Sequence, residues 1–230
     1  MTPGLKTSVL LAALQLSDTA FPTGVFAHSF RLEACREAGE LRDEADLRRL
    51  VGLYLASLAT SDCVALRVAY GADALEQTVQ ADRLLAATKA TRELREANAR
   101  TGRQFLRSFA ALGAENALLE GFRLAAKRGE TPGSYAVGYA LAARSVRVPE
   151  EGAVAAYLFS SAASLVAAGQ KLIPLGGSAA QRVLFGLRGG IETAAESSRA
   201  VGADGMYSFA PTLDVRSAQH ERQQTRLYIS

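Results

Sequence analysis

Apolar residues recur at helical spacing along most of the chain, and no stretch sustains the alternation of apolar and polar residues that is typical of a strand. The fold class is therefore predicted to be all-α, a single-domain helical bundle of roughly eight to ten helices. The spacing predicts helices within residues 8–16, 27–37, 43–58, 63–70, 75–88, 87–106, 114–127, 134–146, 152–170 and 183–200.

The stretch 17–33 interrupts this pattern between the first two helices. Pro22 lacks a backbone N–H and disfavours the α conformation at Phe21, and Gly24 permits a positive φ. Phe21 and Phe26 are large apolar residues on a turn, so we expect them to pack and to fix the angle between the flanking helices. From the residues alone, a helix–turn–helix corner with a structural role is the favoured interpretation.

A charged segment lies within residues 87–106, where Glu93 and Glu96 alternate with arginines. This pattern is typical of a solvated helix face with ion pairs, each of which contributes little to stability. Gly102 is unusual there, because glycine inside a helix costs about 1 kcal/mol relative to alanine. We therefore expect a close helix crossing at Gly102.

Residues 152–170 form a run of nineteen residues without a charge, which is close to transmembrane length. Twelve of the nineteen are Gly, Ala or Ser, so membrane insertion would be weakly driven. The sequence predicts instead a central helix that is buried on all sides, in a protein that does not enter the membrane.

The composition narrows the function classes further. The chain of 230 residues has a net charge of +3, and its arginines are scattered rather than gathered in a basic block with aromatic residues, which argues against nucleic-acid binding. Cys35 and Cys63 are the only cysteines and form no C-x-x-C motif, which favours a reducing, cytoplasmic compartment. The apolar run 9–16 contains Gln15 and no cleavage motif, so no signal peptide is expected.

Few residues could carry catalysis or bind a metal. The two histidines, His28 and His220, lie in no H-x-x-x-H or E-x-x-H motif, and the chain has neither a P-loop nor a G-x-S-x-G motif. His28 and Cys35 could share a helix face, but two helical turns separate them by roughly 10 Å, too far for one metal ion. We predict no catalytic residue, no metal site and no cofactor, and hence a binding or assembly protein rather than an enzyme.

Three segments resemble signature blocks of the urease accessory protein F (UreF) family. They are FPTGVFAHSFRLE at 21–33, the segment ATKATRELREANARTGR at 87–103, and QKLIPLGGSAAQR at 170–182. Residues 208–214 and the C-terminal HERQQTRLYIS at 220–230 are similar to the family as well. The departures from the family pattern include Val25, Thr101, Lys171, Gly177, Gln224, Tyr228 and Ile229.

The resemblance implies a fold, a function and partners. It implies an all-helical homodimer, with residues 1–215 as the UreF-like domain and 216–230 as a partner-binding tail. It implies a cytoplasmic nickel-insertion chaperone that bridges UreD (also called UreH) and the GTPase UreG, and so delivers nickel to apo-urease. Any nickel binding would belong to the complex. The residues that the resemblance assigns to partner binding are Phe21, Pro22, Gly24, Phe26, His28, Lys171, His220, Arg226, Leu227 and Tyr228.

Two of these residues have a more specific expectation. Lys171 is a candidate for a partner contact or for lining a nickel path, although a cation at the end of a helix also has a purely structural explanation. Arg226 is the candidate for an arginine that acts on the GTPase.

Two alternatives remain open at this point. One is an all-α enzyme with a hydrophobic substrate, which would need convergent acidic residues or a motif such as D-D-x-x-D, and the sequence contains none. The other is a helical regulatory protein with no metal role, which would be distinguished by its failure to bind UreD/UreH and UreG.

Overall fold

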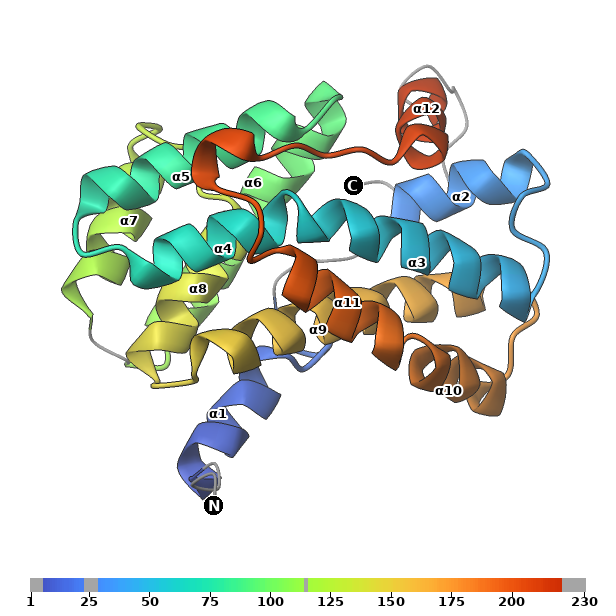
Figure 1. Ribbon diagram of the computed structural model, residues 1–230, viewed down its shortest axis with the longest axis horizontal. Coiled ribbons are helices and arrows are strands. Elements are labelled where there is room, and N and C mark those ends of the chain that lie inside the picture. The colour runs from blue at the N-terminus through green and yellow to red at the C-terminus, as the bar shows by residue number, and fades with distance from the viewer. Residues whose placement is uncertain (1–5, 23–28, 114–115, 221–230) are drawn as a thin grey trace.

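Twelve α-helices occur in the residues that the computed structural model describes, namely 6–22, 29–113 and 116–220, and these residues contain no strand (Figure 1). Counting α3–α4 and α10–α11 as single bent rods, because only one or two residues separate each pair, gives ten. The prediction of an all-α, single-domain bundle is confirmed. The helices are α1 (Thr7–Leu16), α2 (Ser29–Glu37), α3 (Glu44–Ala59), α4 (Asp62–Gly71), α5 (Leu75–Thr88), α6 (Arg92–Ala110), α7 (Ala117–Lys127), α8 (Tyr135–Ser145), α9 (Glu150–Leu172), α10 (Gly177–Gly186), α11 (Arg188–Ser197) and α12 (Pro211–His220).

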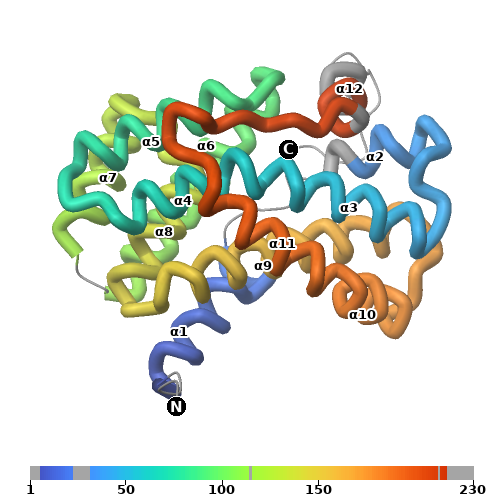
Figure 2. The backbone as a smooth tube through the Cα atoms, viewed as in Figure 1, coloured from blue at the N-terminus to red at the C-terminus, as the bar shows by residue number. Residues whose placement is uncertain are grey.

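The rod formed by α3 and α4 runs along the long axis of the molecule, with α9 beneath it in the view of Figure 1. Helices α5 to α8 gather around α4, whereas α2, α10 and α12 lie around α3 (Figure 1). Figure 2 shows the chain passing from α11 through the short 3₁₀ helix η2 (Ala203–Gly205) to α12, across the junction of α3 and α4. There the Tyr207 amide donates a hydrogen bond to the Thr60 carbonyl at 3.0 Å, and the Thr60 hydroxyl donates one to the Tyr207 carbonyl at 2.8 Å.

The uncharged run predicted to be a central helix lies in α9, which packs against α2, α3, α8, α10 and α11. Two helical stretches, Glu44–Gly71 and α9, are long and apolar enough to cross a membrane by length and composition alone. In each stretch, the greater part of the most apolar 18-residue segment is buried inside the fold: 67% of it in Glu44–Gly71 and 61% of it in α9. Burial of this extent is characteristic of core helices in a folded domain, but the prediction that 152–170 is buried on all sides is wrong, because Gly152, Ala155 and Phe159 are exposed.

Helices α6 and α8 approach most closely where Gly102 meets the turn that precedes α8. A Cβ atom at Gly102 would lie 2.0 Å from the carbonyl oxygen of Gly133 and 2.5 Å from the amide nitrogen of Tyr135. Gly133 itself has a φ of +77°, a left-handed conformation that favours glycine. The predicted close crossing at Gly102 is therefore confirmed. The surface that Gly102 meets is the backbone of the turn before α8.

The turn before α8 is held by a side chain from another helix. Although Thr131 followed by Pro132 is typical of a helix start, α8 begins at Tyr135 and the Thr131 hydroxyl donates to Asp82 at 2.6 Å. The buried Asp82 carboxylate also accepts the backbone N–H groups of Gly133 and Ser134, at 2.7 and 2.8 Å. A carboxylate from α5 thus satisfies the turn before α8, a role that local sequence does not indicate.

One helix boundary in the C-terminal half differs from the prediction. After Pro174, α10 begins at Gly177 and shows no side-chain cap, so Ser178 lies inside the helix. The single helix predicted over 183–200 is divided at Leu187, directly after Gly186, into α10 and α11.

An aromatic cluster joins α6, α8 and α9 in the core. We define it by Phe21, Phe105, Phe109, Tyr135, Tyr139 and Tyr157, whose neighbouring rings have centres 5.2 to 6.0 Å apart. Burial raises the pKa of Tyr139 to about 12, so its hydroxyl stays protonated at neutral pH. The cluster reaches from the centre of the domain to the turn after α1.

Candidate partner-binding surfaces

The turn after α1 is fixed to α6. The ring of Phe21 is half-buried and lies 5.3 Å from the ring of Phe105, and the Pro22 carbonyl accepts the Ser108 hydroxyl at 3.1 Å. The expectation that Phe21 packs is confirmed. The turn is therefore a built part of the domain, and Pro22, which is exposed, lies at its surface.

For most of the residues predicted to bind partners, the structure does not describe the side chain. The backbone of His220 ends α12, but its side chain is not described. Those with no described position are Gly24, Phe26, His28, Arg226, Leu227 and Tyr228.

Lys171 lies in the last turn of α9 and is exposed. It is followed by the exposed Pro174 and by α10, which lines a larger surface feature. The structure thus separates Lys171, at the α9–α10 end of the molecule, from the Phe21 turn on α6 (Figure 1).

We call this larger feature the α9–α10 face and define it by Arg48, Phe159, Arg182, Leu184, Phe185 and Arg188, which line a hollow of about 810 Å³. Phe159 and Phe185 are 45% and 67% exposed, which is unusual for phenylalanine. The Arg188 guanidinium lies 4.5 Å from the centre of the Phe185 ring. The sequence pattern did not indicate this face, since its one signal was a phenylalanine in a helix made mostly of small residues.

A third exposed apolar surface belongs to α1, which projects from the body of the domain (Figure 1). Leu10, Leu11 and Leu14 are 46%, 60% and 59% exposed. The end of α1 is held by the buried Leu16 and by a contact of 3.1 Å between the hydroxyls of Ser17 and Tyr139.

The base of the C-terminal tail is attached to the domain through α12, which packs against α2. Arg216 of α12 binds Glu40 with its Nε at 3.1 Å from Oε2 and its Nη2 at 2.5 Å from Oε1. Hydrogen bonding to Arg216 holds the pKa of Glu40 below its ordinary value. The contact therefore stabilises the fold at neutral pH, and its contribution is lost as the pH falls through the lowered pKa.

One buried ion pair lies inside the domain. Asp62, at the start of α4, pairs with Lys89 and accepts the hydroxyls of Ser61 at 2.9 Å and Tyr157 at 3.3 Å. The side chains of Asp62 and Lys89 are only 4% and 11% exposed. The arrangement connects α4, α9 and the segment before α6, so we assign it to stability.

The described residues contain no group of three or more His, Cys, Asp or Glu side chains that could hold a metal ion. Cys35 and Cys63 are buried, and desolvation raises the pKa of Cys35 to about 12 and raises that of Cys63 as well. Both thiols are therefore protonated at neutral pH, a state in which they are poor metal ligands and poor nucleophiles.

These features together define a class: an all-α protein whose buried polar groups hold the fold together and whose exterior offers apolar and cationic surfaces to other proteins. The sequence profile of the family UreF matches residues 41–188, and the chain belongs to the UreF family. Its relatives are urease accessory proteins, so its role lies in urease maturation, as an accessory protein.

The similarity extends over nearly the whole chain. The urease accessory protein UreF of Corynebacterium glutamicum (strain R) is 34% identical over 218 residues, 94% of this chain and 96% of the relative. The protein of the same name from Arthrobacter sp. (strain FB24) is 33% identical over 97% of this chain and 98% of its own length. That from Azoarcus sp. (strain BH72) is 34% identical over 96% of this chain and 95% of its own length.

Proposed function

We propose that this protein is a cytoplasmic nickel-insertion chaperone that bridges UreD/UreH and the GTPase UreG during the maturation of urease. The observation that carries the proposal is the similarity to urease accessory proteins over almost the full length of the chain. In this proposal the turn at Phe21 and Pro22, Lys171 and the tail residues His220, Arg226, Leu227 and Tyr228 contact the partners.

The chemistry of the described residues supports a carrier complex rather than a metal store. A metal ion that has to move on should meet weak oxygen ligands and water, because dense soft ligands would retain it. Both thiols of this chain are buried and protonated at neutral pH. Nickel would therefore pass through the assembled complex, with Lys171 as a candidate for lining its path.

The first experiment removes the tail. We expect the intact chain, co-expressed with UreD/UreH and UreG, to form an assembly with two copies of each protein, and the chain truncated after Gln219 to form none. The truncation keeps nearly all of α12 and its Arg216–Glu40 contact, so the helical domain should remain folded. Light scattering coupled to size-exclusion chromatography measures the masses, and circular dichroism verifies the fold.

The results separate the parts of the proposal. If the intact chain binds neither partner, the bridging role is contradicted and a helical regulatory protein is favoured. An assembly that forms equally well without residues 220–230 would remove the tail from the partner interface.

The homodimer is the second part of the proposal, and we assign it to the α9–α10 face. A fully buried phenylalanine contributes about 1.5–3 kcal/mol, so the two exposed phenylalanines suit the apolar centre of a self-complementary interface. Phe185→Asp should therefore convert a dimer of the 24.3 kDa chain into a monomer, as measured by light scattering.

Leu112→Asp is the matched control, because Leu112 is also exposed, at 52%, but lies at the end of α6. It should leave the dimer intact. If Phe185→Asp remains dimeric, the interface lies elsewhere, and the exposed leucines of α1 become the next surface to test.

A further inference from the structure

Hollows lie between α6 and α7, two helices at the other end of the molecule from α10 (Figure 1). Two hollows of about 510 and 500 Å³ share Leu106 and Arg123 in their linings and so lie side by side. We call the two together the α6–α7 groove; its lining includes Arg103, Leu106, Arg107 and Ala110 from α6, and Leu119, Arg123, Ala126 and Lys127 from α7.

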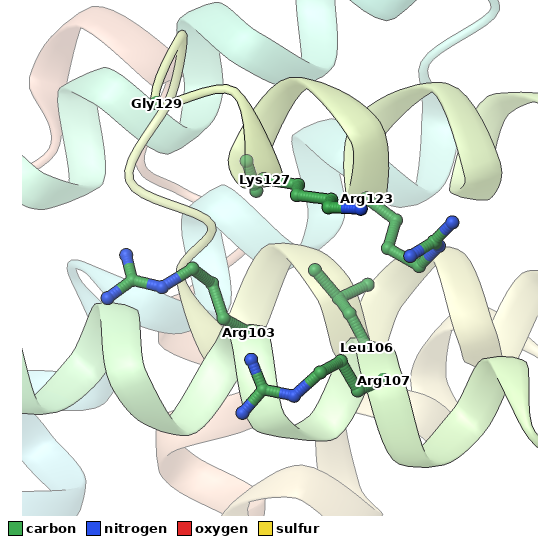
Figure 3. Close-up of a pocket in the computed structure, with 7 residues that line it drawn as sticks. Arg103, Leu106, Arg107, Arg123, Lys127 and Gly129 are labelled. Carbon is green, nitrogen blue, oxygen red and sulfur yellow. The ribbon is translucent and has the colours of Figure 1, made fainter.

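One end of the groove is strongly cationic. Arg103 and Arg107 project from α6, and Arg123 and Lys127 project from α7, with Leu106 between them (Figure 3). Arg123 is already paired, because its Nε and Nη2 bind the two carboxylate oxygens of Glu120 at 2.7 and 2.6 Å. Among the described residues that line the groove, Glu120 is the only one with a carboxylate. No carboxylate of the lining therefore balances the positive charges of Arg103, Arg107 and Lys127.

The guanidinium groups have donors to spare. Arg103 uses Nη1 to bind the Pro132 carbonyl at 2.9 Å, and Arg107 uses Nη2 to bind Gln104. Each guanidinium carries five N–H donors in a fixed fork that matches a carboxylate. These two hydrogen bonds orient the side chains and leave most of their donors for a ligand.

The other end of the groove is less charged. It is lined by Ala110, Gly113, Ala117 and Leu119, and its floor is continuous with Leu106, which is 1% exposed. From Arg103 to Ala110 the groove follows seven residues of helix, roughly 10 Å, which an extended peptide covers in about three residues. A small anion would occupy only the cationic end, whereas a peptide would use both ends.

We propose that the α6–α7 groove binds an acidic segment of a partner protein, with Asp or Glu carboxylates on Arg103, Arg107 and Lys127 and an apolar side chain over Leu106. Charge complementarity selects the occupant. The chain's own tail does not match, because residues 221–230 contain Arg222 and Arg226 against a single Glu221. This inference is independent of urease maturation, since any partner with such a segment would satisfy it.

The test uses the full-length protein and short fluorescein-labelled peptides. One peptide alternates pairs of Glu with single Leu residues, and its counterpart carries Gln in place of Glu. We expect the Glu peptide to bind at low ionic strength, measured by fluorescence anisotropy, and the Gln peptide to bind at least about tenfold more weakly, because the contacts are charge-assisted.

The variant Arg107→Glu/Lys127→Glu reverses two exposed charges of the groove, and Arg36→Glu/Arg92→Glu makes the same change of net charge on other exposed sites. The groove variant should lose at least about tenfold in affinity for the Glu peptide, and the control less than about twofold, since distant exposed charges are screened. Circular dichroism and urea denaturation are used to verify that both variants fold.

Several results would overturn the inference. Equal binding of the Glu and Gln peptides would make the groove merely apolar. Displacement of the Glu peptide by inorganic phosphate at equal charge concentration would indicate a site for small anions. Equal losses in both variants would mean non-specific attraction. If light scattering at high protein concentration shows an additional, heavier species that the groove variant lacks, the occupant of the groove is a second copy of this chain.

Discussion

Replacing Gly102 with alanine should destabilise the domain by about 4 kcal/mol or more, the largest effect of any single methyl group that we can identify in this fold. The new Cβ would lie 2.0 Å from the Gly133 carbonyl oxygen and 2.5 Å from the Tyr135 amide nitrogen. Both contacts are with backbone, so no side chain can rotate away and α6 would have to separate from α8. Urea denaturation followed by circular dichroism measures the change in unfolding free energy.

Gly52→Ala is the matched control, since Gly52 is also inside a helix but a Cβ there would meet no atom within 4 Å. That substitution should stabilise the protein by up to about 1 kcal/mol through helix propensity alone. If Gly102→Ala lowered the unfolding free energy by less than about 1 kcal/mol, the close crossing of α6 and α8 would be wrong.

Replacing Lys89 with methionine should lower the unfolding free energy by about 3–5 kcal/mol, because it removes the cation that pairs with the buried Asp62 carboxylate. The side chain of Asp62 is 4% exposed and also accepts the hydroxyls of Ser61 and Tyr157. The same urea denaturation measures this effect.

Two variants show whether the charge is responsible. The double variant Lys89→Met/Asp62→Asn removes both charges and should recover most of the lost stability, since a neutral amide is far less costly to bury. Arg92→Met breaks an exposed pair with Glu96, whose side chain is 67% exposed, and should change stability by about 0.5 kcal/mol or less. A double variant no more stable than Lys89→Met alone would show that packing, and not charge, makes the site sensitive.

Helix periodicity and glycine placement were sufficient to predict much of the fold. The helix over 75–88 was predicted with the bounds that α5 has, and the turn at Thr60 and Ser61 lies where the polar residues interrupt the apolar pattern. Gly102 could be assigned to a helix crossing because its cost in a helix interior required a reason. These are local signals, and each is carried by residues close together in the sequence.

The contacts that the sequence did not reveal are long-range. Asp82 caps the turn before α8 from about fifty positions away, and nothing near Thr131 indicates that its hydroxyl binds a carboxylate on α5. Lys89 and Asp62 are likewise paired only by the folding of α5 back onto α4. Such pairings depend on the packing of whole helices.

The candidate surfaces were predicted only in part. Resemblance to the family marked the turn at Phe21 and the residue Lys171, but not the α9–α10 face or the α6–α7 groove. Phe185 in the sequence looks like any core residue, and only the packing of α10 shows that its ring is 67% exposed. In the sequence, the arginines of α6 are typical of a solvated helix face. The opposite wall of the groove belongs to α7, a separate helix, so the groove exists only once α6 and α7 are packed together.

The burial of both thiols has a practical consequence for labelling chemistry. Cys35 and Cys63 are fully enclosed, and only a thiolate reacts readily with a maleimide dye. A cysteine introduced on the surface would therefore be the one position that takes a fluorophore, with no need to remove the native pair. A donor dye placed on α7 could then show, by energy transfer to an acceptor on a candidate partner, whether the two proteins associate, in otherwise wild-type protein.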